Sequence, residues 1–370
     1  MIVYIGLTVW IIVVNLIFRP VKVISPLDGT TTQRAKNIQV FLTMGLIAFI
    51  LGMNSGIADT YAYIRSFNKI NVGIGQIFDF SIYTNQKGPV FYALAILCKS
   101  IVPNYHFFFV TVTGISGFLV ARTFQKYSEY YSDAILLFML TATFTWMING
   151  IRQFLAVALL FYFSKLIVKK QIIPYIIVLI IAYGIHNSSI LMLPVFFIVF
   201  GKAWNKRTIL LIVALLIALL LYSNQFNSVL MDVVEDYADS LVTAHGSNPL
   251  RTIIYGIPTV LAFIRRKKIE ECAPTYINIC INMSILCVAT SLIANFTSGT
   301  LVGRVPIYFS LFNLILLPWL IEKVYFENRI AFRIIMYVAY SLYFLIEGNV
   351  AYYSDALFGG VHIQPLHLFG

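Results

Sequence analysis

Three arginines lie at the ends of apolar segments, where a charged residue is costly and therefore usually has a purpose. Arg152 separates two apolar runs, and Arg251 and Arg304 each stand at the start of another. A guanidinium stays protonated and can bind phosphate through two parallel N–H groups. The three residues are therefore candidates for binding a phosphate-bearing ligand. The alternative is that each side chain only extends to the lipid headgroups.

Asp59 and His186 are the candidates for proton transfer beside such a ligand. His186 lies in the polar turn 186–189 between two apolar runs, and Asp59 follows the run 38–53. Histidine and carboxylate groups can both act as general bases. A hydrogen-bonded structural histidine and a helix-capping Asp remain open as alternatives. No HxxxH, HxH or paired acidic motif accompanies His186, so we expect neither a metal nor a cofactor.

The composition predicts which elements must position these residues. The chain has 370 residues, 60% of them hydrophobic and 11% charged, with a mean hydropathy of +0.85. These values exclude a soluble globular enzyme, a disordered chain and a secreted disulfide scaffold. Continuous apolar runs favour an all-α polytopic membrane protein over a β-barrel. The net charge of +11 fits the positive-inside bias, so we expect no nucleic-acid partner.

The hydropathy pattern predicts about 12 transmembrane helices, since a span needs about 20 mostly apolar residues. A further apolar stretch, 89–98, meets Lys99 too soon to span. We expect residues 89–102 to form a juxtamembrane helix at the interface. The predicted span cores are 2–18, 38–53, 106–121, 134–148, 154–168, 173–185, 188–201, 208–222, 252–264, 273–295, 304–321 and 330–346.

The distribution of basic residues predicts the orientation. With the loop 19–37 in the cytoplasm, only seven of the 26 Lys and Arg lie on the outer face. Those seven are Arg65, Lys69, Lys87, Lys99, Arg152, Arg251 and Arg304. We therefore predict one integral membrane domain, 1–370, with both termini extracytoplasmic. Its two large outer loops are 54–105, which includes the juxtamembrane helix, and 223–251. We also expect four candidate residues to converge at the outer face: Asp59, Arg152, His186 and Arg304.

Three short motifs resemble the EpsG family, whose members are Wzy-type polymerases of exopolysaccharide, capsule and O-antigen repeat units. The motifs are Asp59-x-Tyr61-x-Tyr63, Asn149-x-x-Arg152-Gln153-x-x-Ala156 and His186-x-Ser188, with Gly303-Arg304-x-x-x-Tyr308 further along. Their order and spacing fit the family over residues 40–200. The family often has Gly-Thr before its Asp, where this chain has Ile57-Ala58.

A fainter resemblance links residues 86–125 to C-type glycosyltransferases. Gln86-Lys87-Gly-Pro89 is similar to the Lys-Pro-Pro-like element that opens a juxtamembrane helix in the first outer loop of those enzymes. In that fold an Asp early in the same loop is catalytic. This resemblance also implies an interfacial 89–102 and an outer Asp59.

The resemblance implies a glycosyltransferase of the bacterial inner membrane that polymerises oligosaccharide repeats linked to polyprenyl diphosphate. Arg152 and Arg304, and less directly Arg251, would bind the diphosphate, and Asp59 or His186 would act as the base. Membrane lipids, a flippase and a chain-length regulator are the implied partners. A lipid-linked glycan flippase or transporter, an O-antigen ligase and a single-sugar C-type transferase remain alternatives. The side chains expected to bind or position sugars are Tyr61, Tyr63, Arg65, Lys87, Gln153 and Tyr308.

Overall fold

The computed structural model describes residues 2–24, 31–53, 60–84, 86–221, 247–296 and 302–357, and these are almost entirely helical. The first helices are α1 (Ile2–Ile17), α2 (Asn37–Val40), α3 (Leu46–Gly52), α4 (Thr60–Lys69), α5 (Pro89–Ile101), α6 (Tyr105–Tyr127), α7 (Tyr131–Leu140) and α8 (Ile151–Tyr162). They are followed by α9 (Lys165–Val168), α10 (Ile172–Ile185), α11 (Met192–Val199), α12 (Lys206–Leu221), α15 (Pro249–Ile264), α16 (Arg266–Cys272), α17 (Thr275–Phe296), α18 (Ile307–Trp319) and α19 (Arg329–Leu357).

Short turns of 3-10 or π-helix connect or extend these helices. The π-helical turns are η1 (Phe41–Gly45) and η8 (Leu320–Val324), and the 3-10 turns are η2 (Ile74–Gln76), η3 (Phe80–Tyr83), η4 (Thr143–Met147), η5 (Asn187–Leu191), η7 (Val302–Arg304) and η9 (Phe326–Asn328). Each of the twelve predicted span cores overlaps a helix.

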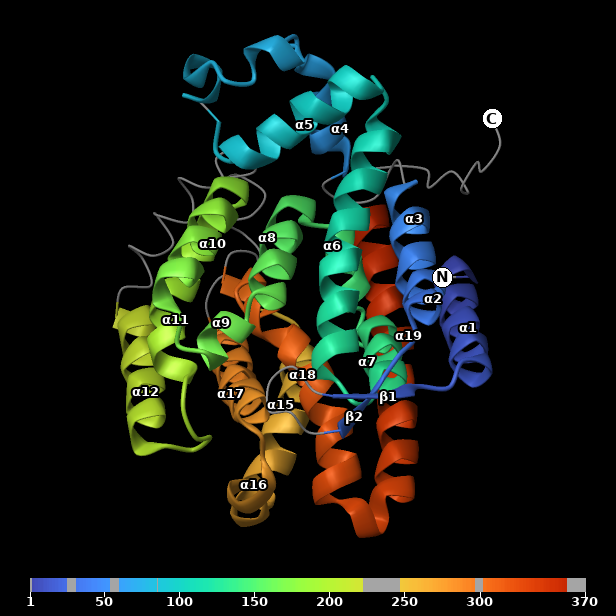
Figure 1. The fold of residues 1–370 in the computed structure, drawn as a ribbon, viewed down its shortest axis with the longest axis vertical. Helices are drawn as coiled ribbons and strands as arrows, with labels where there is room; N and C mark the ends of the chain where they lie inside the picture. The colour runs from blue at the N-terminus through green and yellow to red at the C-terminus, as the bar shows by residue number, and fades with distance from the viewer. Residues whose placement is uncertain are drawn as a thin grey trace.

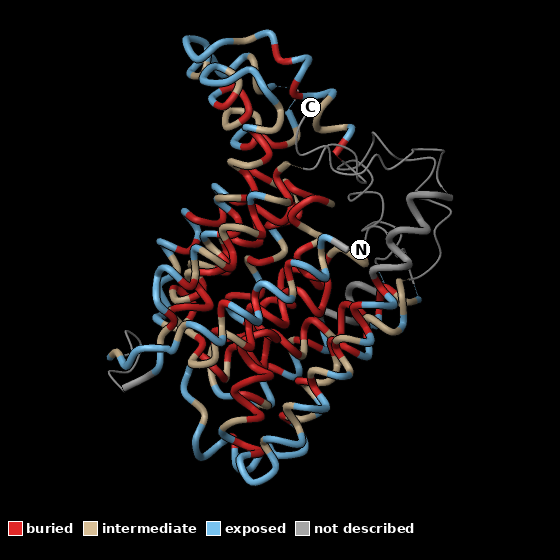
Figure 2. The backbone as a smooth tube through the Cα atoms, turned by 90° about the vertical axis from the view of Figure 1, so that its right-hand side faces the viewer, coloured by how far each residue is buried: buried red, intermediate tan, exposed pale blue. Residues whose placement is uncertain are grey.

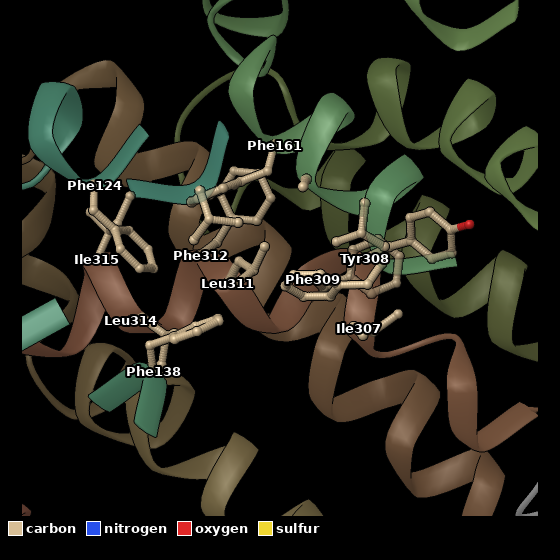
Figure 3. Close-up of a cluster of buried hydrophobic side chains, with 14 of the residues drawn as sticks. Phe124, Phe138, Phe161, Ile307, Tyr308, Phe309, Leu311, Phe312, Leu314 and Ile315 are labelled. Atoms are coloured by element: carbon tan, nitrogen blue, oxygen red, sulfur yellow. The ribbon is translucent and has the colours of Figure 1, made fainter. Parts of the chain in front are cut away.

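Helix α18 lies at the centre of the bundle. All of its residues from Ile307 to Trp319 are buried, because α17, α7, α8 and α15 surround it. The ring of Phe312 meets that of Phe161 on α8 edge to face, with centroids 4.9 Å apart (Figure 3). Buried residues follow the middle of the bundle, and exposed residues gather at its ends and on its outer helix faces (Figure 2).

The bundle is that of a multi-pass membrane protein. Among the described residues, five helical segments are long and apolar enough to cross a membrane: Tyr105–Tyr127, Ile151–Val168, Thr275–Phe296, Val302–Val324 and Phe326–Glu347. Shorter apolar helices accompany them, so the number of twelve spans stays a prediction. The outward side chains are apolar too: Ile173, Ile177 and Ile180 on α10 are all exposed, as a lipid-facing surface requires.

Helix α5 lies across one end of the bundle, together with α4 (Figure 1). We call this end the α5 end. The 13 residues of helix α5 span about 20 Å, which is shorter than the hydrocarbon core of a bilayer. The Lys99 ammonium donates to the carbonyls of Phe67, Asn68 and Ile70 at 2.8–3.0 Å, which ties α5 to the C-terminal end of α4. The interfacial position of 89–102 stays a prediction.

The region around the far end of α6, which we call the hairpin end, carries an element that the sequence did not predict (Figure 1). Strands β1 (Val21–Ile24) and β2 (Thr31–Arg34) pair antiparallel within the segment expected to be a plain loop, 19–37. The β-branched residues of both strands favour extended pairing, but each strand is too short to stand out from hydropathy alone.

Candidate functional site

The first part of the site is the turn that starts α8. Gly150 adopts φ +80°, a left-handed conformation that favours glycine, between η4 and the first turn of α8. This turn places Arg152 in the first turn of the helix. A Cβ atom on Gly150 would lie 3.4 Å from the Trp146 ring and 4.0 Å from Nη1 of Arg304. The guanidinium of Arg304 therefore lies beside the start of α8.

His186 lies where α10 ends and η5 begins, and a chain of hydroxyl groups holds it. Its Nδ1 lies 2.7 Å from the Ser188 hydroxyl, which lies 2.9 Å from the Tyr308 hydroxyl. Tyr308 belongs to the first turn of α18 (Figure 3), so the chain links two helices that are distant in sequence. Ser188 and Tyr308 are buried, and His186 is half-buried.

Arg152, His186 and Arg304 form one cluster. Gln153 Nε2 donates to the backbone carbonyl of Arg304 at 3.1 Å, which joins α8 to η7. Burial, and then the positive charges of Arg152 and Arg304, lower the pKa of His186 to about 3. His186 is consequently neutral at physiological pH, beside two permanent cations.

The N-terminus of α5 closes one side of this cluster. A Cβ atom on Gly88 would lie 2.7 Å from the Ile185 carbonyl oxygen and 3.2 Å from Cδ of Arg152. Glycine is thus required for α5 to start against both α10 and the Arg152 side chain. Lys87 directly precedes this contact, and Val90 packs on Gly184 of α10.

The guanidinium of Arg152 has a hydrogen-bond donor without a partner in the described residues. Its Nε is buried and has no hydrogen-bond partner, and within the described chain no acidic side chain forms an ion pair with it. A buried guanidinium N–H without a partner is costly, so a ligand oxygen would satisfy it. In the described residues no three His, Cys, Asp or Glu side chains gather where they could hold a metal.

Arg251, the third predicted arginine, already has a carboxylate partner. Arg251 forms an ion pair with Glu347 of α19, and Asn248 donates to the same carboxylate at 3.0 Å. A neighbouring carboxylate therefore already compensates the charge of Arg251, so we leave this residue out of the cluster. The sequence motifs carried no signal for Glu347, because it lies in the last helix, outside the resemblance.

The aromatic residues of α4 are divided between packing and exposure. The Tyr63 ring meets Phe91 of α5 edge to face, with centroids 5.9 Å apart, whereas Tyr61 and Arg65 are exposed. Asp59 and nearly all of the predicted outer loop 223–251 lie outside the described residues.

Of the predicted site residues, the structure brings together Arg152, Gln153, His186, Arg304 and Tyr308, with Lys87 beside them. It adds Gly88, Gly150 and Ser188.

Fold and cluster together define a class: a multi-pass helical membrane protein with two arginines and a neutral histidine gathered at one end of its bundle. A comparison with protein families matches residues 37–356 to the EpsG family. The chain therefore belongs to the EpsG family, a family of polysaccharide polymerase-like membrane proteins. Neither the curated proteins nor the solved structures compared with it include a significant match.

Proposed function

We propose that this protein polymerises oligosaccharide repeat units linked to polyprenyl diphosphate, at the extracytoplasmic face of a bacterial inner membrane. The observation that carries the proposal is the convergence of Arg152 and Arg304 beside His186. Two guanidiniums at the end of a membrane bundle suit a diphosphate attached to a lipid. Their positive charge complements the negative diphosphate, and the end of the bundle is where the headgroup of a membrane lipid lies.

The proposed reaction is a glycosyl transfer. The bond between the anomeric carbon of the growing glycan and its diphosphate oxygen breaks, and the bonding electrons leave with the diphosphate. A hydroxyl oxygen of the incoming lipid-linked repeat forms the new glycosidic bond and loses its proton to a base. Arg152 and Arg304 stabilise the negative charge that develops on the departing diphosphate.

The chemistry of His186 bears on the choice of base. An imidazole whose pKa is lowered to about 3 accepts a proton only weakly, so we propose that His186 contributes as a neutral hydrogen-bonding group. Asp59 is then the first candidate for the base. It immediately precedes Thr60, the first residue of α4, in the segment between α3 and the residues that pack on α5.

Analysis of glycan length in a strain that lacks the chain tests this function. We expect single-repeat glycans without the protein and long chains when the wild type is restored. Restoration with the Arg152→Ala variant should leave single repeats at normal protein abundance. The control variant Lys267→Ala, which changes an exposed residue of α16, should restore long chains. Loss of all surface glycan in the deletion strain would instead indicate a flippase.

A further inference from the structure

The far end of α6 gathers basic residues that the proposed function does not use. Helix α6 begins beside α5 and runs to the hairpin end, a distance of about 34 Å for its 23 residues. We propose that Arg34, Arg122, Lys126 and Lys165, here called the hairpin-end cluster, bind the phosphate headgroup of an acidic phospholipid. The acyl chains of this lipid lie along the outer face of α6.

Hydrogen bonds fix one side of the cluster. Gln125 Nε2 donates to the carbonyl of Ala35 at 2.8 Å and to Oδ1 of Asn37 at 2.9 Å. Arg122 donates to the same Asn37 oxygen at 3.1 Å. These bonds hold the end of β2, and with it Arg34, against the last turns of α6.

An aromatic contact fixes the other side. The Tyr127 ring stacks on Tyr276 of α17 with centroids 4.7 Å apart, and the Tyr276 hydroxyl lies 3.0 Å from the Ser164 hydroxyl. Lys126 and Lys165 adjoin Tyr127 and Ser164 in the chain. The Lys126 ammonium is accordingly repelled by Lys165, Arg34, Lys169 and Arg122.

The charge of this cluster is not compensated within the described residues. Its four side chains are half-buried, and none forms an ion pair there. Two other cations at the same end do have carboxylate partners: Arg333 pairs with Asp133, and Lys323 pairs with Glu129. Holding like charges together costs free energy, which a bound anion offsets.

The apolar surface beside the cluster favours a lipid over a soluble anion. Phe118 and Ile115 lie four and seven residues before Arg122, hence on the same face of α6, and both are exposed. Ile38 and Phe41, from the adjoining α2 and η1, are exposed as well. A headgroup on the cluster would therefore lie at the end of an apolar surface about 10 Å long. Basic pockets between membrane helices are known to bind anionic lipid headgroups in this way.

Native mass spectrometry of the full-length protein in detergent tests the proposal. The probes are dioleoyl phosphatidylglycerol, dioleoyl phosphatidylcholine and inorganic phosphate. We expect saturable binding of phosphatidylglycerol only. The double variant Lys126→Gln/Lys165→Gln should bind it roughly thirtyfold more weakly, at about fivefold per cation. The control Lys206→Gln/Lys267→Gln removes the same charge from exposed positions and should bind as the wild type does.

A second variant tests the acyl-chain contact without changing any charge. Phe118→Ala removes an exposed ring from α6 and should weaken phosphatidylglycerol binding several-fold while the fold stays intact. Equal binding of the two lipids by the wild type, or unchanged binding in Lys126→Gln/Lys165→Gln, would overturn the site. Saturable binding of inorganic phosphate to the cluster would overturn the assignment to a lipid.

Discussion

At the scale of single residues, Arg152 is the side chain with the most clearly defined proposed role. Its positive charge acts on His186, Arg304 lies near the start of the same helix, and the buried Nε of Arg152 lacks a hydrogen-bond partner. A side chain that only extended to the headgroups would need its charge alone. The proposed role needs the planar guanidinium as well, because only that group donates two parallel hydrogen bonds to a phosphate.

We expect Arg152→Lys to cut polymer formation about ten- to a hundredfold, since it keeps the charge and loses a charge-assisted hydrogen bond of about 1.5–3 kcal/mol. The measurement is glycan chain length at matched membrane abundance. Arg19→Lys, at an exposed position at the end of α1, serves as the control and should be silent. Wild-type chain lengths in Arg152→Lys would leave Arg304 as the leading cation.

His186 should stay neutral across physiological pH, because burial and the two arginines lower its pKa to about 3. An unfolded histidine binds a proton near its ordinary pKa of about 6.5, so this residue makes the protein less stable as the pH falls below that value. NMR of histidine-labelled protein, with His186→Asn for assignment, should show no His186 titration between about pH 5 and 8. A midpoint near 6.5 would contradict the placement of His186 beside the two arginines.

At the scale of elements, the start of α5 is the contact on which the geometry of the cluster depends. Gly88 leaves no room for a Cβ atom against the backbone of α10 and the side chain of Arg152. Three elements from distant parts of the chain therefore meet at one glycine. Because one of the contacting atoms is a backbone oxygen, the clash cannot be relieved by rotating a side chain.

Gly88→Ala should move the start of α5 away from Arg152 and destabilise the protein by about 1–3 kcal/mol, the usual cost of overpacking. Thermal unfolding in detergent and polymer length report the two effects. Gly114→Ala is the matched control, since the space around Gly114 in α6 is open and alanine favours a helix. Equal unfolding temperatures for Gly88→Ala and wild type would show that this contact is not tight.

The interfacial position of α5 is tested by cysteine labelling. Lys87→Cys and Asn104→Cys, made in a Cys272→Ser background that removes the exposed native thiol, flank the helix. If α5 lies along the interface, an impermeant reagent added outside intact cells should label both. Labelling of the two positions from opposite faces of the membrane would make α5 a span and change the predicted orientation of the first hundred residues.

At the scale of the whole molecule, the two ends of the bundle differ in their electrostatics. The α5 end holds Arg152 and Arg304 beside a neutral histidine, whereas the hairpin end combines the uncompensated hairpin-end cluster with a paired network. In that network Arg333 bridges Asp133 and Glu322 at 3.0 and 2.9 Å, and Tyr337 also donates to Asp133. The network joins α7 to η8 and α19.

Asp133→Asn should destabilise the protein by about 1–2 kcal/mol, because Asp133 is buried and accepts hydrogen bonds from two donors. The loss is limited because Arg333 is partly exposed and keeps its ion pair with Glu322. Glu129→Gln, in the more exposed pair with Lys323, should cost less than about 1 kcal/mol. Thermal unfolding of the two variants in one detergent measures the difference. Equal losses would mean that burial of Asp133 adds nothing.

The sequence by itself determined the class of the molecule and named the candidate residues for its site. Long apolar runs predict membrane helices because a bilayer admits few other structures, and every predicted core overlaps a helix. The unusual positions of Arg152, His186 and Arg304 at the ends of apolar runs marked them as candidates. Hydropathy also predicted that the apolar stretch 89–98 is too short to span; the helix found there, α5, has 13 residues, and its interfacial position stays a prediction.

Only the tertiary structure decided which of these candidates meet. The pairing of Arg251 with Glu347 joins positions 96 residues apart, and the contact of Gly88 with Arg152 depends on how α5 crosses the bundle end. The short strands of the hairpin also escaped hydropathy, which averages over longer windows. Contacts between distant helices arise from packing that no local pattern encodes, so the sequence could name the charged residues while the fold selected their partners.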